Sequence, residues 1–156
     1  MNAPASHELV ISRLLDAPRE QVFRCWIDPA HLARWWLPPG FTNTACEVDP
    51  RPGGVLRLGM RSPDGQDYPC EGVFEEVTPP ERLVFRGTGP ATHPCGSGLP
   101  PHSRVTVSLA EEDGRTRLTL HTRFPSPQAL AAARSHGFES SWLGALEGFA
   151  HYLRQH

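Results

Sequence analysis

The run from Leu15 to Gly54 constrains the fold more than any other part of the chain. An apolar segment ends at a proline, an amphipathic stretch follows, and two adjacent tryptophans precede the turn sequence RPGG. Val22, Phe23 and Trp26 recur at helical spacing and form one apolar face, which predicts a helix. The run therefore predicts a strand, a helical segment and the turn that opens a first hairpin.

Prolines mark the ends of the helices in this run. Asp16 or Ala17 can cap the first helix, and Pro18 suits its first turn. Pro29 ends that helix, and a second short helix over residues 29–36 ends before a PPG turn. Two short helices joined at a proline form a corner rather than a bundle.

Beyond residue 41 the apolar pattern changes to period two, with Pro, Gly and Asp turn signals between the segments. Leu118 and Leu120 alternate with Thr119 and His121, so one face of the sheet is apolar and the other faces water. A first strand is expected over residues 7–15. Six further strands are expected over residues 43–49, 55–62, 67–77, 82–87, 103–111 and 115–124.

The segment from Ser126 to His156 is the only cover left for the apolar face. Ser126 and Pro127 are a good cap and first-turn pair, and apolar residues then follow at three- and four-residue steps. Gly137 breaks the segment, which leaves a core helix over about residues 135–155 with a length of roughly 30 Å. The pattern predicts an α+β architecture of order β-α-α-β6-α, with a curved antiparallel sheet wrapped around the C-terminal helix.

Composition defines the class of protein. With 156 residues, 38% of them hydrophobic and 21% charged, the chain is expected to form a single globular domain over residues 1–156. The start MNAPASHE has no apolar signal core and no stretch is apolar enough to cross a membrane, so we expect a cytoplasmic protein without membrane contact. The 15 basic residues are spread along the chain against 17 acids, which argues against nucleic-acid binding.

Cysteines and histidines give a weak metal signal. The cysteines show no CxxC pair, so neither a zinc knuckle nor a redox pair is expected. His93, Cys95 and His102 could meet in a Gly/Pro-rich loop, but their spacing matches no known ligand frame. We expect no metal and no cofactor. The cysteines are Cys25, Cys46, Cys70 and Cys95.

Ordered fragments spanning nearly the whole chain carry a family resemblance. They are DAPREQVFRCWIDPAHLARWW, GF with EVDPRPGG, PDGQDYPCEGVFEEVTPPERLVF, SRVTVSLAEEDGRTRLTLH and GFESSWLGALEGFAHYL. They resemble the single-domain bacterial proteins named after the activator of the 90-kDa heat-shock chaperone's ATPase, within the START-like (SRPBCC, helix-grip) superfamily. The resemblance implies a helix-grip fold. Leu37 replaces a usual glycine, Phe138 a common tryptophan, and residues 87–102 differ most, so no ligand or partner contact of that loop is transferred.

The superfamily resemblance implies a binding module that holds a small hydrophobic or aromatic molecule between the sheet and the C-terminal helix. The competing interpretation is that the same residues simply pack as core. Alternation and helix phase give the expected lining as Leu56, Leu58, Met60, Tyr68, Cys70, Phe74, Phe85, Val105, Val107, Leu118, Leu120, Phe138, Trp142 and Leu146, with Trp26, Trp35 and Phe41 near an entrance.

Trp35 and Trp36 are adjacent, which limits how deeply both rings can be buried. Neighbouring residues on a helix point about 100° apart, so both rings are not expected to lie equally deep. We expect one ring in the core and the other at the entrance or in a subunit contact. An exposed pair would favour a homodimer.

Catalysis is a second hypothesis, because some START-like proteins resemble cyclases, dehydratases or hydrolases that act on aromatic or polyketide-type substrates. The candidate acid and base groups are Tyr68, Glu71, His121 and Asp49. Alternation places Glu71 and His121 on the polar face and Asp49 at a turn, which leaves Tyr68 as the inward-facing candidate. The sequence contains no nucleophile triad, HExxH or phosphate-binding loop motif, so binding is favoured over catalysis.

Regulation of a chaperone ATPase is a third hypothesis, which rests on the family's name alone. The eukaryotic co-chaperone of that name carries a further large domain that contributes to chaperone binding. These 156 residues are too few to contain such a domain, and we therefore do not expect a chaperone partner.

Overall fold

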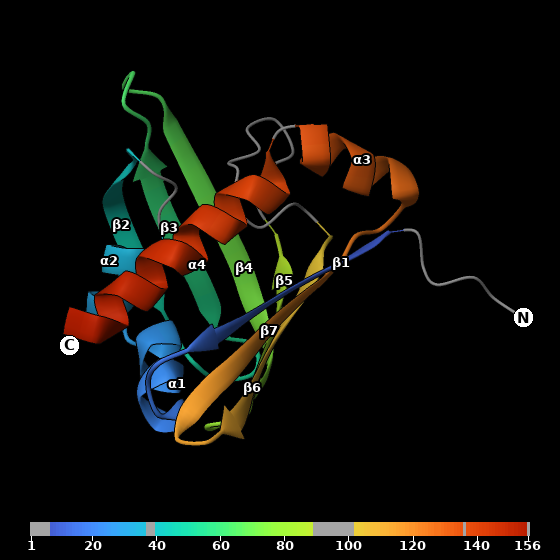
Figure 1. Ribbon diagram of the computed structural model, residues 1–156. Helices are drawn as coiled ribbons and strands as arrows, with labels where there is room; N and C mark the ends of the chain where they lie inside the picture. The colour runs from blue at the N-terminus through green and yellow to red at the C-terminus, as the bar shows by residue number, and fades with distance from the viewer. Residues whose placement is uncertain (1–6, 37–39, 89–101, 136, 156) are drawn as a thin grey trace, which may run out of the picture.

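The computed structural model describes residues 7–36, 40–88, 102–135 and 137–155, with the side chains of residues 68, 69 and 141 excepted (Figure 1). The predicted order of elements is confirmed, and the C-terminal segment is divided at Gly137 as expected. In chain order the elements are β1 Glu8–Leu15, α1 Arg19–Ile27, α2 Pro29–Trp35, β2 Thr42–Val48, β3 Val55–Arg61, β4 Asp67–Thr78, β5 Arg82–Gly87, β6 Arg104–Glu112, β7 Arg115–Arg123, α3 Pro127–Ser135 and α4 Phe138–Gln155.

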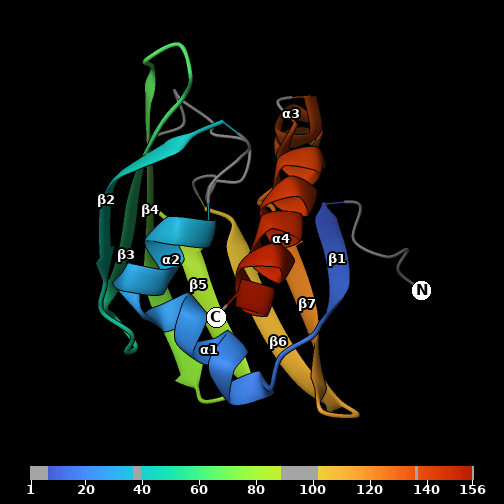
Figure 2. The ribbon, with the colours of Figure 1, turned by 60° about the vertical axis from the view of Figure 1, so that its left-hand side comes forward.

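The strands form one antiparallel sheet in the order β1-β7-β6-β5-β4-β3-β2. Figure 2 shows α4 in the hollow of this curled sheet, with β1 and β7 on one side and β2, β3 and β4 on the other. Register shifts at Asn43/Ala45 in β2 and at Phe74/Glu76 in β4 increase the local bend, as β-bulges do. The fold is therefore the expected α+β helix-grip arrangement.

The corner between α1 and α2 is built around Asp28. Its backbone N–H donates to the Arg24 carbonyl at 2.9 Å and ends α1, while its carboxylate accepts from the Ala30 N–H at 2.9 Å and caps α2. One residue thus ends one helix and begins the next, so the two helices meet at an angle. None of the helices in the described part of the chain is long and apolar enough to cross a membrane.

The beginning of α1 differs from the prediction that Asp16 or Ala17 would cap it. The residue at the cap position is Pro18, whose backbone is extended and whose side chain cannot accept a hydrogen bond. The Pro18 carbonyl instead accepts from the N–H groups of Gln21 and Val22 at 3.0 and 3.1 Å. The helix therefore begins at Arg19, later than an Asp16 or Ala17 cap would require.

The RPGG turn between β2 and β3 is fixed to the neighbouring strand β4. The Gly53 N–H donates to the Phe74 carbonyl at 2.8 Å, and the Phe74 N–H donates to the Gly54 carbonyl at 2.9 Å. At Gly54 a side chain would collide with the Asp49 carbonyl, and Gly53 has a positive φ of 84°. Both glycines are therefore required by the geometry of this turn.

Candidate functional site

The space between the sheet and α4 holds most of the residues predicted to line a ligand cavity. Except for Phe41, which is half-buried, and Tyr68, whose side chain lies outside the described residues, every one of them is buried. The structure thus brings these residues together from β3 to β7, the helical corner and α4. Their contact with a ligand stays a prediction.

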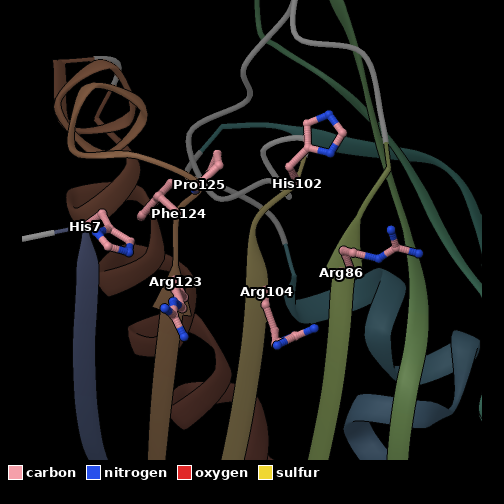
Figure 3. A pocket seen from close by; sticks show the side chains of 7 residues that line it. All are labelled: His7, Arg86, His102, Arg104, Arg123, Phe124 and Pro125. Atoms are coloured by element: carbon pink, nitrogen blue, oxygen red, sulfur yellow. The ribbon is translucent and has the colours of Figure 1, made fainter. Parts of the chain in front are cut away.

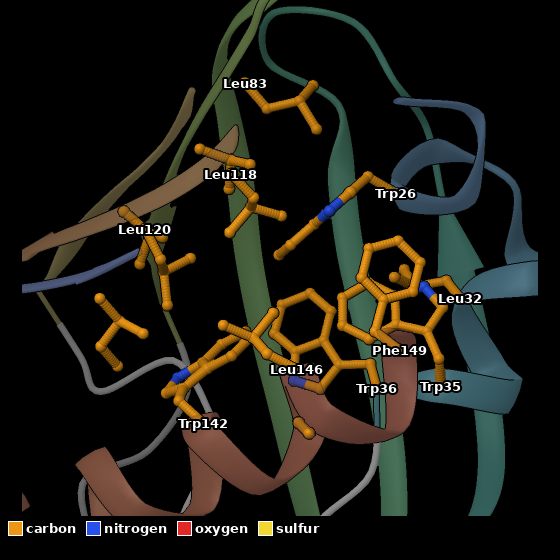
Figure 4. Close-up of a cluster of buried hydrophobic side chains, with 14 of the residues drawn as sticks. Trp26, Leu32, Trp35, Trp36, Leu83, Leu118, Leu120, Trp142, Leu146 and Phe149 are labelled. Atoms are coloured by element: carbon orange, nitrogen blue, oxygen red, sulfur yellow. The ribbon is translucent and has the colours of Figure 1, made fainter. Parts of the chain in front are cut away.

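An aromatic cluster occupies the side of this interior that faces α1 and α2 (Figure 4). The Trp26 ring is at its centre, with centroid distances of 4.7 Å to Trp35, 5.5 Å to Trp36 and 6.2 Å to Trp142. Phe149 of α4 stacks on Trp35 at 4.1 Å. Offset and edge-to-face contacts of this kind contribute beyond the apolar area that they bury, so the cluster joins the corner to α4.

Trp35 and Trp36 correct the expectation that one of the two rings would be shallow. Their exposed fractions are 3% and 0%, and their rings stack with a centroid distance of 5.9 Å. The Trp36 N–H still donates to the Leu32 carbonyl at 3.0 Å, so the helical turn reaches Trp36. Both rings are nevertheless buried, because α4 covers both of them: Phe149 packs on Trp35 and Trp142 packs on Trp36. Trp26 is likewise 1% exposed. The exposed aromatic pair that would have favoured a homodimer is not formed.

The indole N–H groups of this cluster are not all paired. The Trp35 N–H donates to the Cys25 carbonyl at 2.9 Å. That carbonyl needs a donor from outside α1, because the residue four positions further is Pro29, which has no N–H. The N–H groups of Trp26 and Trp142 are fully buried and have no hydrogen-bond partner among the residues that the structure describes. The interior therefore contains two unused donors among apolar side chains.

Three of the candidate acid and base groups are engaged in separate side-chain contacts. His121 contacts the Glu8 carboxylate on the outer face, where the flanking residues of β7 point inward. Glu71 lies 3.3 Å from the Arg57 guanidinium, and Asp49 lies 2.8 Å from that of Arg51 in the turn. The structure does not bring these groups together into one site.

Of the described cysteines, Cys25 and Cys70 are buried and Cys46 is half-buried. Burial raises the pKa of Cys25 to about 11; the Arg24 charge opposes this shift and that of Asp28 adds to it. Burial also raises the pKa of Cys46. His93 and Cys95 of the weighed metal cluster lie outside the described residues, and among those described no three His, Cys, Asp or Glu side chains could hold a metal ion.

A second place of interest lies outside the barrel-like interior, at one end of the strands (Figure 3). A pocket of about 260 Å³ opens there, lined by His7, Arg86, His102, Arg104, Arg123, Phe124 and Pro125. The sequence analysis missed it because its arginines are far apart along the chain. The alternation of each strand does place these arginines on the outer face near a strand end. Only the register between the strands, however, brings them next to one another.

Comparison with known families decides what kind of chain this is. The sequence model of the family described as Activator of Hsp90 ATPase homolog 1-like protein matches residues 16–154. The chain belongs to this family. Membership and fold support a ligand-binding type of domain in general terms.

Solved structures agree with membership in the Activator of Hsp90 ATPase homolog 1-like family. A protein of Nitrosomonas europaea is 26% identical with a TM-score of 0.86, over 98% of this chain and 97% of its own. A protein of Mycobacterium smegmatis is 27% identical with a TM-score of 0.83, over 96% and 92%. An AHSA1-like protein of Aeromonas hydrophila, 24% identical with a TM-score of 0.72 over 95% and 92%, shares the fold. No curated protein matches the chain.

Proposed function

We propose that this protein binds a small, largely apolar or aromatic molecule that carries a hydrogen-bond acceptor, in the interior between the sheet and α4. The observation that carries the proposal is the pair of unused indole donors on Trp26 and Trp142. Buried N–H groups in proteins nearly always have a partner, and an unpaired one costs about 1–3 kcal/mol. An acceptor on a ligand would remove this cost.

The surroundings of the two donors suit a ligand of this kind. Trp26 comes from α1 and Trp142 from α4, and their rings are nearly parallel, at 15°. Leu118 and Leu120 of β7 lie across the same interior in Figure 4 and are buried. A ligand that contacts Trp142 therefore finds apolar walls for its body and one polar group for its orientation.

The same packing sets a condition on binding. The rings around Trp26 are already in contact, and protein interiors close-pack without large voids. A ligand that reaches the Trp26 N–H must therefore displace side chains of the helical corner. The contacts described above support neither of the two alternatives, which are catalysis by Tyr68 and regulation of a chaperone.

A matched pair of ligands tests the proposal. 2-Acetylnaphthalene and 2-ethylnaphthalene have nearly the same shape, but only the ketone carries an acceptor. By calorimetry we expect wild-type protein to prefer the ketone by about tenfold, which is the value of roughly one net hydrogen bond. Native mass spectrometry of freshly purified protein should also show a bound small molecule.

Substitutions of single tryptophans test whether the preference for the ketone comes from the indole N–H groups. In Trp142→Phe or Trp26→Phe the preference for the ketone should fall toward unity, because the N–H is removed. Trp35→Phe is the control, since its N–H already serves the Cys25 carbonyl. If neither naphthalene binds and no small molecule copurifies, or if all three variants keep the preference, the proposal is wrong.

A further inference from the structure

Three arginines stand in one row across the outer face of the sheet. The register pairs Arg86 of β5 with Arg104 of β6, and Arg104 with Arg123 of β7. Like charges directly opposite each other on neighbouring strands destabilise a sheet. We call Arg86, Arg104 and Arg123 the arginine row.

In the part of the outer face formed by β2, β3 and β4 the register places arginines opposite carboxylates. Arg57 of β3 is flanked by Glu47 of β2 and Glu71 of β4, at 2.9 and 3.3 Å. Arg61 is opposite Asp67 at 2.8 Å. Against this background the arginine row is an accumulation of positive charge in a chain whose net charge is −2.

The carboxylates around the row compensate it only in part. Glu75 lies 2.7 Å from the Arg104 guanidinium and 3.6 Å from that of Arg86, so one carboxylate serves two cations. Glu8 is the register partner of Arg123 on β1, but its carboxylate contacts His121 instead. Among the residues that the structure describes, Arg123 therefore has no carboxylate partner.

Two histidines border the same pocket and are held by backbone hydrogen bonds. The Phe124 N–H donates to the His7 carbonyl at 2.8 Å, which places His7 beside the end of β7. The His102 N–H donates to the Gly87 carbonyl at 3.0 Å, which places His102 beside the end of β5. Figure 3 shows both histidines at the strand ends with the arginine row below them. None of the described residues that line the pocket is acidic.

We propose that this pocket binds a phosphate group, with the guanidinium groups of Arg104 and Arg123 as its main partners. Guanidinium groups present paired N–H donors that match phosphate oxygens, and such charge-assisted bonds are the strong ones. The volume of about 260 Å³ leaves room beside the phosphate for a small organic part against Pro125. The proposal does not depend on a ligand in the interior, which lies on the other face of the sheet.

Calorimetric titration with inorganic phosphate and with phenyl phosphate tests the site. Sodium chloride at matched ionic strength and phenol are the controls. We expect saturable binding with a Kd on the order of 1 mM, as suits an exposed site with a few charge-assisted contacts. Heat that merely follows ionic strength, with no saturation, would overturn the proposal.

Single substitutions locate the binding. Arg123→Ser and Arg104→Ser should each weaken phosphate binding by about tenfold or more, whereas Arg57→Ser, on the balanced part of the same face, should leave it unchanged. Thermal unfolding confirms that each variant is folded. Equal losses in all three variants, or none in Arg123→Ser and Arg104→Ser, would contradict the assignment.

A further arm identifies the source of the phosphate. Phosphatidylcholine vesicles with and without phosphatidic acid are sedimented with the protein. Tighter binding of phenyl phosphate than of inorganic phosphate, without vesicle binding, supports a small phosphate ester. Binding to phosphatidic acid that is lost in Arg123→Ser supports a lipid headgroup. Because Trp142→Phe lies in the interior, it should leave all these results unchanged.

Discussion

The two faces of the sheet both carry polar groups that the chain does not match, but for opposite reasons. On the inner face the unmatched groups are neutral indole N–H donors of Trp26 and Trp142, enclosed among apolar side chains. On the outer face they are the cations of the arginine row, which water and salt reach. Burial makes an unmatched donor costly, whereas solvent screening makes unmatched cations nearly free of cost.

The two kinds of unmatched group therefore affect different properties of the protein. A buried donor without a partner lowers the free energy of unfolding, so a substitution that removes the donor should change stability. An exposed arginine row contributes little to folding, so its role should be visible in binding and in salt dependence. Matched substitutions on the two faces should therefore differ in their effects on stability and on binding.

The largest expected effect is on the inner face at Trp142. Trp142→Ala should lower the free energy of unfolding by about 3–5 kcal/mol, because it leaves a cavity beneath α4. Leu143→Ala is the matched control: its side chain is 49% exposed on the same helix, and a change within about 0.5 kcal/mol is expected. Urea unfolding measures both, and similar losses in the two variants would contradict the packing described here.

A second prediction compares a paired indole with an unpaired one. Trp35→Phe removes the donor of the Cys25 carbonyl, whereas Trp142→Phe removes a donor without a partner. Trp35→Phe should therefore be the more destabilising by about 1–2 kcal/mol, the cost of leaving a buried acceptor unpaired. The same urea experiment decides it, and a greater loss in Trp142→Phe would show that its N–H has a partner.

The buried thiol of Cys25 gives a pH-dependent prediction for the inner side. With its pKa raised to about 11 by burial, the thiolate is scarce at pH 8, and iodoacetamide should label Cys25 at least tenfold more slowly in the folded protein than in urea. The unfolded thiol has the lower value of 9.0 and loses its proton first, so stability is fully present below pH 9 and falls as pH rises toward 11.

Peptide mapping by mass spectrometry follows the labelling of Cys25, and Cys25→Ser is the control for the pH dependence. This variant should lose less stability than wild type between pH 9 and 11. Equal labelling rates in the folded and urea-unfolded states would show that the thiol is not protected.

The smallest effects are expected on the outer face. Arg57→Thr removes a cation that contacts two carboxylates and should cost a few tenths of a kcal/mol, whereas Arg123→Thr should leave stability unchanged or raise it by a similar amount. The difference between the variants should vanish in 0.5 M NaCl, because salt screens exposed charges. Chemical denaturation at two salt concentrations checks this, and a costlier Arg123→Thr would reveal a partner for Arg123.

The helices, strands and turns could be predicted from local patterns in the sequence. The Ser126 hydroxyl accepts from the Ala129 N–H at 3.1 Å, as the cap prediction requires, and Gly137 takes a positive φ of 80° between α3 and α4. Such features depend on a few neighbouring residues. The order of elements followed from them.

The depth of Trp36 and the position of the arginine row depend on geometry that no local pattern contains. Trp36 is buried because Trp142 of α4 and Phe85 of β5 pack on its ring, and Arg104 meets Arg123 because of the register between β6 and β7. The pairing of Trp35 with the Cys25 carbonyl likewise joins two helices. The interior could therefore be predicted as a set of apolar residues, but its two unused donors could not.

The place of β1 in the sheet has a consequence for how the chain acquires its structure. The first strand pairs with the last, with Glu8 opposite Arg123, while the hairpins from β2 to β5 join neighbours in sequence. Local hairpins close faster than contacts between distant segments. On the ribosome the N-terminal strand therefore has to wait until β7 has emerged, and its apolar residues need protection throughout that interval.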